Sequence, residues 1–237
     1  MNIIPAILES SYQEIQNKIE SILHDVPKVH IDICDGLFVP KKTWPYSASS
    51  NNRIDESVQV QKLLNEEEGL PNWDNINYEF DLMVQNPNLH QDIWGRIGAN
   101  TLIIHPTSFK DEASMMDFIK EIESYLIDIV IAVTYDEYFK YDQIIQDLLD
   151  RKVVKALQVM TIKTIGAQGQ KFDERCVGLI EKLKSENSEI FIRVDGGINT
   201  DTMSRLVNLN VDEFVIGSAI FNSGNARENL NYFIDMC

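Results

Sequence analysis

Eight apolar, strand-like segments recur along the 237-residue chain, and a helix-like segment follows each of them. The strand-like segments are mostly continuous apolar runs, which is typical of parallel strands covered on both faces. Eight such units in a chain of this length are the pattern of an α/β fold of the (β/α)8 TIM barrel type; a doubly wound open sheet is the alternative. The expected strands lie at about 2–6, 28–34, 78–84, 101–105, 127–133, 153–160, 190–194 and 212–216, and the expected helices at about 12–23, 56–67, 88–97, 110–125, 136–150, 173–186, 200–208 and 225–236.

No boundary divides the chain, so the sequence predicts a single barrel domain over residues 1–237. The segment at about 41–75 is longer than a usual βα connection, and its first part is polar and rich in Ser and Asn. We expect this segment to be an enlarged connection within the domain.

Charge and hydropathy exclude two classes of partner. The 37 acidic and 21 basic residues give a net charge of −16, whereas nucleic-acid binding needs clustered Lys and Arg. No apolar run approaches the roughly 20 residues of a membrane span. We therefore expect no nucleic acid and no membrane as partners. A small phosphorylated ligand stays open, because backbone N–H groups at a helix start hold phosphate without a lysine.

The first five residues lack a basic region and a cleavage site, so we expect no secretion signal. The three cysteines, Cys34, Cys176 and Cys237, are an odd number without metal-finger spacing, which indicates a reducing, cytoplasmic setting. Cys34 is better explained as a small apolar filler than as a nucleophile. Barrels of this kind often associate, so a homo-oligomer is compatible with the sequence.

Titratable residues gather at the ends of several expected strands. His30 and Asp32 are two residues apart, as are Glu79 and Asp81, so each pair shares one face of its strand. Active sites of such barrels lie at the carboxyl ends of the strands. We expect these side chains to converge on a divalent cation, for which zinc, manganese and iron are suited. The residues at these ends are His30, Asp32, Glu79, Asp81, His105 and Asp195. His105 either lines this cavity or caps a strand-end carbonyl.

Three glycine-bearing loops follow the last three expected strands, and loops at this place are the usual phosphate cradle of a (β/α)8 barrel. Glycine there lets the backbone approach phosphate oxygens closely. The sequence therefore predicts a phosphate or substrate site formed by Gly166, Gly169, Gly196, Gly197, Gly217 and Ser218.

Several motifs, in this order, resemble those of the ribulose-phosphate 3-epimerase family over nearly the whole chain. The stretches that carry the resemblance are 4–8 (IPAIL), 30–40 (HIDICDGLFVP), 82–87 (LMVQNP), 104–106 (IHP), Met160 with the loop 166–172, 194–198 (VDGGI) and 217–221 (GSAIF). The resemblance implies a (β/α)8 fold of the ribulose-phosphate-binding type, a small phosphorylated sugar as substrate and a divalent metal, often zinc, iron or manganese.

The resemblance also implies a reaction and its residues. The family inverts the carbon next to the ketone of a ketose phosphate, for instance converting ribulose 5-phosphate to xylulose 5-phosphate. Asp32 and Asp195 then match the two acid/base groups. One removes the C3 proton, the metal stabilises the enediolate oxygens, and the other returns a proton to the opposite face.

Three positions and one segment depart from the family pattern. The second metal histidine falls on Asp81, so the implied ligands are His30, Asp32, Asp81 and Asp195; this oxygen-rich set favours manganese or magnesium. The usual serine after the first-strand proline is Ala6, the asparagine after Val-Pro is Lys41, and the segment 163–166 is about one residue longer.

Two other functions stay open on these departures. The first is an epimerase of another ketose phosphate, such as a ketohexose 6-phosphate. The second is a catalytically inactive barrel that binds a sugar phosphate. Related phosphate-binding decarboxylases use Asp-x-Lys-x-x-Asp, whereas Asp32 and Asp35 enclose no lysine.

Overall fold

A computed structural model describes residues 1–22, 26–47, 53–55, 57–167 and 169–237. The strands are parallel and follow one closed order, β1-β2-β3-β4-β5-β6-β7-β8, which confirms the expected (β/α)8 barrel. The chain divides into two compact units, the 7–129 unit and the 130–237 unit; the latter also includes Met1–Ala6. The divisions fall within β1 (Asn2–Ile7) and β5 (Asp128–Thr134).

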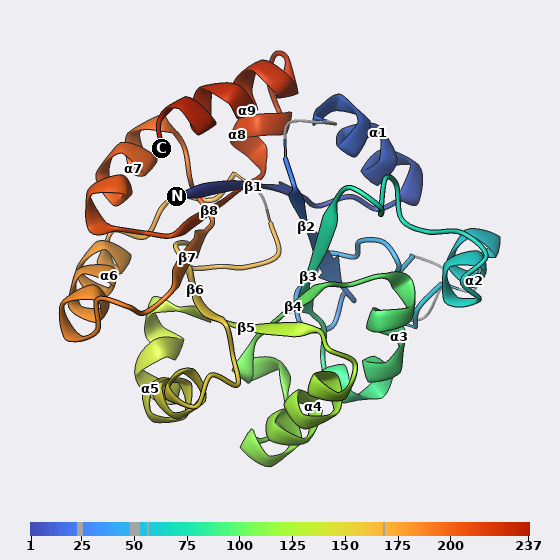
Figure 1. The fold of residues 1–237 in the computed structure, drawn as a ribbon, viewed down its shortest axis with the longest axis horizontal. Helices are drawn as coiled ribbons and strands as arrows, with labels where there is room; N and C mark the ends of the chain where they lie inside the picture. The colour runs from blue at the N-terminus through green and yellow to red at the C-terminus, as the bar shows by residue number, and fades with distance from the viewer. Residues whose placement is uncertain (23–25, 48–52, 56, 168) are drawn as a thin grey trace. The chain divides into compact units, whose positions relative to one another are not determined.

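In the 7–129 unit, three neighbouring strands pair in parallel, and the helices lie outside them (Figure 1). The strands are β2 (Lys28–Cys34), β3 (Asn77–Met83) and β4 (Thr101–Ile104). The helices are α1 (Tyr12–Ile22), α2 (Val58–Leu64), α3 (Gln91–Ile97) and α4 (Glu112–Ser124), with short 3₁₀ turns η1 (Pro87–His90) and η2 (Pro106–Ser108).

Local sequence signals explain where these helices begin and end. The side chain of Asp111 accepts a hydrogen bond from the Ser114 backbone at 2.8 Å, which closes a capping box at the start of α4. Helix α3 ends at Gly98, whose φ of 113° is a conformation that favours glycine. Helix α1 buries a stripe at helical spacing, formed by Ile15, Ile19 and Ile22.

The 130–237 unit contains the remaining strands and helices, again with helices outside the strands (Figure 1). Besides β1 and β5, its strands are β6 (Ala156–Met160), β7 (Ile192–Asp195) and β8 (Glu213–Ile216). Its helices are α5 (Tyr135–Asp150), α6 (Arg175–Glu186), α7 (Thr200–Leu206), η3 (Val207–Leu209), α8 (Ser218–Phe221) and α9 (Ala226–Asp235). The β7–β8 register sets Arg193 opposite Glu213, with Nε 3.3 Å from Oε2 in a buried ion pair.

Two expected boundaries move inward because helices end in left-handed turns. The strand expected from residue 153 begins at Ala156, since Lys152 has φ 57° and the Val153 N–H donates back to Leu148 O at 2.9 Å. Helix α2 ends at Leu64 rather than at 67, because Glu66 has φ 58° and Glu67 N–H donates to Lys62 O. Residues 23 and 56, expected at helix ends, lie outside the described residues.

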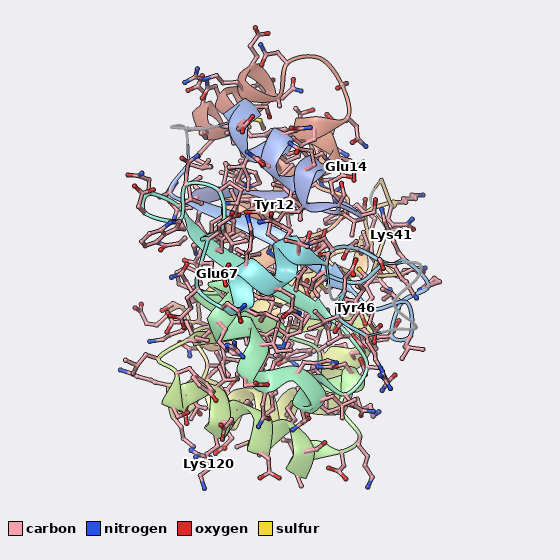
Figure 2. All side chains as sticks on the ribbon, turned by 90° about the vertical axis from the view of Figure 1, so that its right-hand side faces the viewer. Tyr12, Glu14, Lys41, Tyr46, Glu67 and Lys120 are labelled. Carbon is pink, nitrogen blue, oxygen red and sulfur yellow. The ribbon has the colours of Figure 1, made fainter. Side chains whose placement is uncertain are left out.

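The expected enlarged connection follows β2, and Lys41 and Tyr46 are labelled on it in Figure 2. Isolated bridges pair Asp35 with Lys42 and Tyr46 with Ile54, so the described part of this connection folds back on the end of β2. Residues 48–52 and 56 of the connection lie outside the described residues. Among the described helices, none has the length and apolar character that crossing a membrane would need.

Candidate metal and catalytic site

The parallel register of β2 and β3 brings two pairs of titratable side chains together. His30 lies opposite Glu79, and Asp32 lies opposite Asp81. Because side chains two residues apart share a face of a strand, all four occupy one face of this strand pair. All four are buried. Buried charged groups are rare unless they are paired or bind metal, so this cluster requires a chemical explanation.

Glu79 fixes the ring of His30. The Nδ1 of His30 lies 2.8 Å from Oε1 of Glu79, and the other oxygen of Glu79 lies 3.6 Å from Nζ of Lys28. A carboxylate on one ring nitrogen sets the tautomer and orientation of a histidine and leaves the other nitrogen as a ligand. The sequence pattern places Glu79 among the strand-end residues but does not indicate this partner, because the pairing depends on the register between strands.

The other ring nitrogen of His30 faces two carboxylates. His30 Nε2 is buried and makes no hydrogen bond within the described structure. It lies 3.4 Å from Oδ1 of Asp32 and 3.6 Å from Oδ2 of Asp81. Four ligands at about 2.1 Å around a tetrahedral ion are about 3.4 Å apart. The spacing of these three groups therefore fits ligands arranged around one divalent ion better than direct hydrogen bonds, and this His/Asp cluster could hold a metal.

His105 binds the other oxygen of Asp81. Its Nε2 lies 2.7 Å from Oδ1 of Asp81, and both side chains are buried. The sequence left open whether His105 lines the cavity or caps a carbonyl, and this contact places it in the cluster. The carbonyl of His105 is instead bonded by the hydroxyl of Ser108, at 2.8 Å. The ring of Phe38 packs against the imidazole, with centroids 5.6 Å apart.

Burial and neighbouring charges shift the pKa values of Asp32, Asp81 and His30 in opposite directions. Burial raises the pKa of Asp32, and the nearby His30 only partly opposes that effect. Burial would also raise the pKa of Asp81, but the charge and hydrogen bond of His105 hold it well below its usual range. Burial would lower the pKa of His30, yet the surrounding carboxylates raise it well above its ordinary value. The pKa values of Asp32 and Asp81 are thus shifted in opposite directions by their surroundings.

Thr43 holds the backbone of β2 at Asp32. Its hydroxyl donates to the carbonyl of Asp32 at 2.6 Å and accepts from the N–H of Cys34 at 2.7 Å. Thr43 is not predictable from the sequence, because a lone threonine in a polar connection gives no signal of a buried contact. Cys34 itself is fully buried and its thiol pKa is raised by burial, in agreement with a packing role.

Asp35 joins the loop after β2 to the end of β3. One oxygen of Asp35 accepts from the N–H groups of Leu37 and Phe38, at 2.8 and 3.0 Å, and the other accepts from the N–H of Gln85 at 2.9 Å. This single carboxylate therefore sets the position of the loop that carries Phe38.

In the 130–237 unit, Asp195 is the last residue of β7 and is half-buried. One of its carboxylate oxygens lies 3.4 Å from the amide nitrogen of buried Gln158, and its carbonyl accepts from the N–H of Thr161 at 2.7 Å. Asp195 therefore stands at the carboxyl end of its strand, as expected.

The predicted glycine loops require glycine at several positions. Gly166, Gly169, Gly196 and Gly197 all have positive φ, between 67° and 102°. At Gly197 a Cβ would lie 2.9 Å from the Phe172 backbone, so the loops after β6 and β7 are in close contact. Gly217 precedes the short helix α8, and Ser218 is its first residue. Gln168 of the first loop lies outside the described residues.

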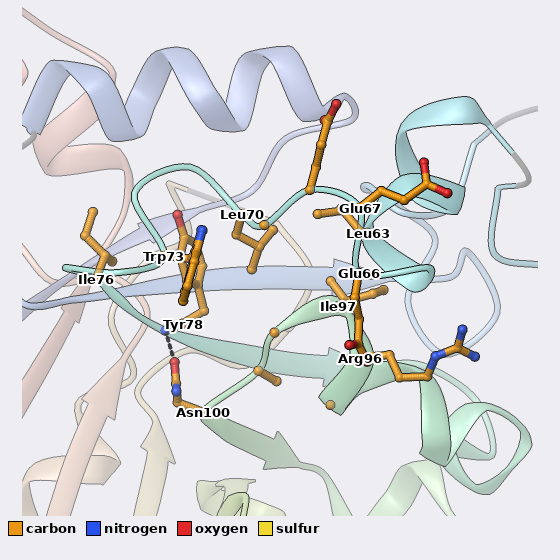
Figure 3. A pocket seen from close by; sticks show the side chains of 15 residues that line it. Leu63, Glu66, Glu67, Leu70, Trp73, Ile76, Tyr78, Arg96, Ile97 and Asn100 are labelled. Atoms are coloured by element: carbon orange, nitrogen blue, oxygen red, sulfur yellow. Dashed lines mark hydrogen bonds between the residues drawn. The ribbon is translucent and has the colours of Figure 1, made fainter.

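A pocket of about 620 Å³ lies elsewhere in the 7–129 unit, between the α2–β3 connection and the end of α3 (Figure 3). Its wall includes Trp73, Tyr78 and Asn100; the Asn100 side chain accepts from the Tyr78 N–H at 2.7 Å. It is lined by residues before or at the start of β3 and β4, and none of the predicted site residues lines it. We assign it no part in the site.

Comparison with known proteins extends these findings. A (β/α)8 enzyme barrel with titratable residues at its strand ends is the class that the fold and site define. The chain matches the Ribulose-phosphate 3 epimerase family over residues 2–221. It belongs to the ribulose-phosphate 3-epimerase family, and it is an enzyme of the isomerase class.

Relatives agree with this family placement, and a solved structure agrees with the fold. The chain is 25% identical to a ribulose-phosphate 3-epimerase of Helicobacter pylori, covering 94% of this chain and 92% of that protein. It is 24% identical to one of Bacillus subtilis, covering 98% and 97%. Among structures, the Streptococcus mutans KGPDC in complex with D-R5P has a TM-score of 0.67 at 17% identity, covering 99% of this chain and 96% of that one. At that identity the structure supports the fold alone.

Proposed function

We propose that this enzyme inverts C3 of a ketose phosphate, converting ribulose 5-phosphate to xylulose 5-phosphate through an enediolate. Membership of the family and the names of its relatives support the reaction type. The observation that carries the chemistry is the buried Nε2 of His30, which faces Asp32 and Asp81 at 3.4 and 3.6 Å. Such a nitrogen, without a hydrogen bond among the described residues, is suited to a metal.

His30, Asp32, Asp81 and Asp195 would hold one divalent ion, which is zinc, manganese, iron or magnesium. Their side chains form a set whose chemistry suits such an ion. Three carboxylates and one imidazole make a hard, oxygen-rich site, so manganese or magnesium is favoured over zinc. When bound, the ion supplies positive charge that stabilises the enediolate oxygens of the substrate, an effect of several kcal/mol.

Asp32 and Asp195 act as the two acid/base groups, because inversion needs a proton carrier on each face of C3. Burial raises the pKa of Asp32 and so strengthens it as a base. Thr43 fixes the backbone at Asp32, and the amide of Gln158 bonds the carboxylate of Asp195. Each proton carrier is therefore attached to a strand and oriented by a buried neighbour, as a preorganised site requires.

Backbone N–H groups of the glycine loops would hold the substrate phosphate. The residues proposed for this are Gly166, Gly169, Gly196, Gly197, Gly217 and Ser218. Backbone donors hold phosphate without a lysine, which suits a chain with a net charge of −16. We also propose that the chain forms a single barrel domain and works in the cytoplasm; its unpaired cysteines Cys34, Cys176 and Cys237 suit a reducing compartment.

Proton exchange at C3 tests this proposal. Ribulose 5-phosphate is incubated with the protein in deuterated water, with Mn²⁺, Zn²⁺ or Mg²⁺ or after treatment with a chelator, and NMR follows C3. We expect exchange and xylulose 5-phosphate with at least one metal. Asp32→Asn and Asp195→Asn should each lower the rate by about 10³-fold, whereas Asp117→Asn on the exposed face of α4 should not.

The alternative functions give different results in the same assay. No exchange under any metal condition would contradict the epimerase and leave a barrel that only binds sugar phosphates. Exchange with a ketohexose 6-phosphate but not with ribulose 5-phosphate would keep the reaction and change the substrate.

A further inference from the structure

The two oxygens of Asp81 lie beside two different histidines. Oδ1 lies 2.7 Å from Nε2 of His105, whereas Oδ2 lies 3.6 Å from Nε2 of His30. His105 is 1% exposed and Asp81 is fully buried, so this contact is shielded from water. One oxygen is therefore taken by a protein donor, and the other is presented to the proposed metal position.

The position of His105 is itself fixed from two sides. Its carbonyl accepts the hydroxyl of Ser108, and its ring packs on Phe38, which Asp35 holds through a backbone hydrogen bond. His105 follows the last residue of β4, and Ile103 and Ile104 pair with Asp81 and Leu82 of β3. The donor to Asp81 therefore directly follows a strand that pairs with the strand of Asp81.

We infer that His105 is a positioning residue that restricts Asp81 to a single ligand oxygen and thereby sets which cations the site accepts. This inference rests on the proposed metal site. A carboxylate with both oxygens available can chelate an ion, which suits Ca²⁺ with its six to eight oxygen ligands at about 2.3–2.6 Å. A carboxylate with one oxygen engaged suits the smaller coordination shells of Zn²⁺ and Mn²⁺. His105 therefore selects against large, oxygen-seeking cations.

Direct titration of metal-free protein with Mn²⁺, Zn²⁺ and Ca²⁺ by calorimetry tests this role without using activity. In His105→Leu, we expect Mn²⁺ and Zn²⁺ to bind about 10- to 100-fold more weakly, the usual effect of losing such a partner. The preference for Mn²⁺ over Ca²⁺ should fall by at least about tenfold. His105→Gln keeps an N–H donor and should largely restore the preference.

The controls separate positioning from general damage. His90→Leu removes a histidine of η1 outside the cluster and should leave all three affinities unchanged. Circular dichroism of the metal-free variants checks that they fold. If His105→Leu does not fold, His105→Asn replaces it, because the shorter side chain of asparagine holds its amide farther from Oδ1 of Asp81. Equal weakening of all three metals would overturn the selective role.

The outcomes also distinguish this inference from the proposed function. Wild-type protein that binds none of the three metals would overturn the metal site and the inference with it. Wild-type protein that binds Mn²⁺ or Zn²⁺, together with an unchanged His105→Leu variant, would overturn the inference alone and leave the proposed function standing.

Discussion

At the scale of single residues, the arrangement of His30 and Asp32 depends on side chains outside the proposed ligand set. Glu79 orients His30, and Thr43 holds the backbone of Asp32. These contacts join residues from different strands or loops, so they depend on register and loop path. The sequence predicts which face His30 and Asp32 share, because that follows from a period of two. It does not predict which residue lies opposite each of them.

Thr43→Val should destabilise the protein by about 1–3 kcal/mol, because the buried N–H of Cys34 and carbonyl of Asp32 each lose a partner while the shape of the side chain is kept. Urea unfolding monitored by circular dichroism measures the change. Thr200→Val, at the exposed start of α7, should stay within about 0.5 kcal/mol of wild type. Equal effects of the two substitutions would contradict a structural role for the Thr43 hydroxyl.

Asp173 should make stability depend on acid pH. Its two oxygens accept from Nε and Nη2 of Arg175, at 3.0 and 2.7 Å, and these hydrogen bonds hold the pKa of Asp173 below its usual range. Since the unfolded value is about 3.9, the contribution is present above that pH and is lost as pH falls through the lower, folded pKa.

The measurement is urea unfolding of wild type and Asp173→Asn between pH 6 and pH 3. Wild type should be more stable at pH 6, by about 1 kcal/mol or less because Arg175 is 39% exposed. The difference should shrink below about pH 4. A difference that stays constant down to pH 3 would show that ionisation of Asp173 does not contribute.

At the scale of elements, the alternation of apolar runs and amphipathic segments predicted all eight strands, because buried parallel strands leave a clear hydrophobic signal. Boundaries were less well predicted where the chain leaves a helix in a left-handed turn at a residue other than glycine. Lys152 and Glu66 do this, and neither residue type signals such a turn. The loops after β6 and β7 were predicted from their glycines. These glycines have positive φ, a backbone conformation that favours glycine.

Gly197→Ala should disturb the contact between these two loops. Its φ of 67° is costly for alanine, and the new Cβ would lie 2.9 Å from the Phe172 backbone. We expect a loss of about 2 kcal/mol or more in stability and weaker binding of inorganic phosphate. Unfolding in urea and phosphate titration by calorimetry measure the two effects.

Gly178→Ala is the matched control for that substitution. Gly178 lies within α6, and nothing stands within 4 Å of its added Cβ. The variant should therefore be more stable than wild type, by about 0.5–1 kcal/mol. Destabilisation by both alanines to the same extent would contradict a specific role for the backbone of Gly197.

At the scale of the whole molecule, a net charge of −16 coincides with a cluster in which carboxylates are buried beside one another. Bringing such groups together opposes folding unless a cation compensates them. A divalent ion that binds only the folded protein should therefore stabilise it strongly. Composition shows the acidic excess, but only the fold shows that part of it is gathered in one buried place.

Thermal unfolding should reveal this stabilisation as a single transition that moves with metal. At about 100 times its Kd, Mn²⁺ adds about 2.7 kcal/mol, which corresponds to a rise of roughly 5–11 °C for a chain of this size. Chelator should reverse the rise, and Asp81→Asn should show a smaller one. An equal rise in that variant would mean that the ion binds elsewhere, and two separate transitions would contradict a single domain.

The hydrogen bonds of Asp35 have a consequence for protein engineering. Because this carboxylate ties Leu37 and Phe38 to the N–H of Gln85, the loop after β2 is not an independent module. A graft that exchanges residues 36–40 to alter sugar preference must retain Asp35 and the backbone path at Gln85. Otherwise Phe38 loses the hydrogen bond to its N–H, and the imidazole of His105 loses the ring packed against it.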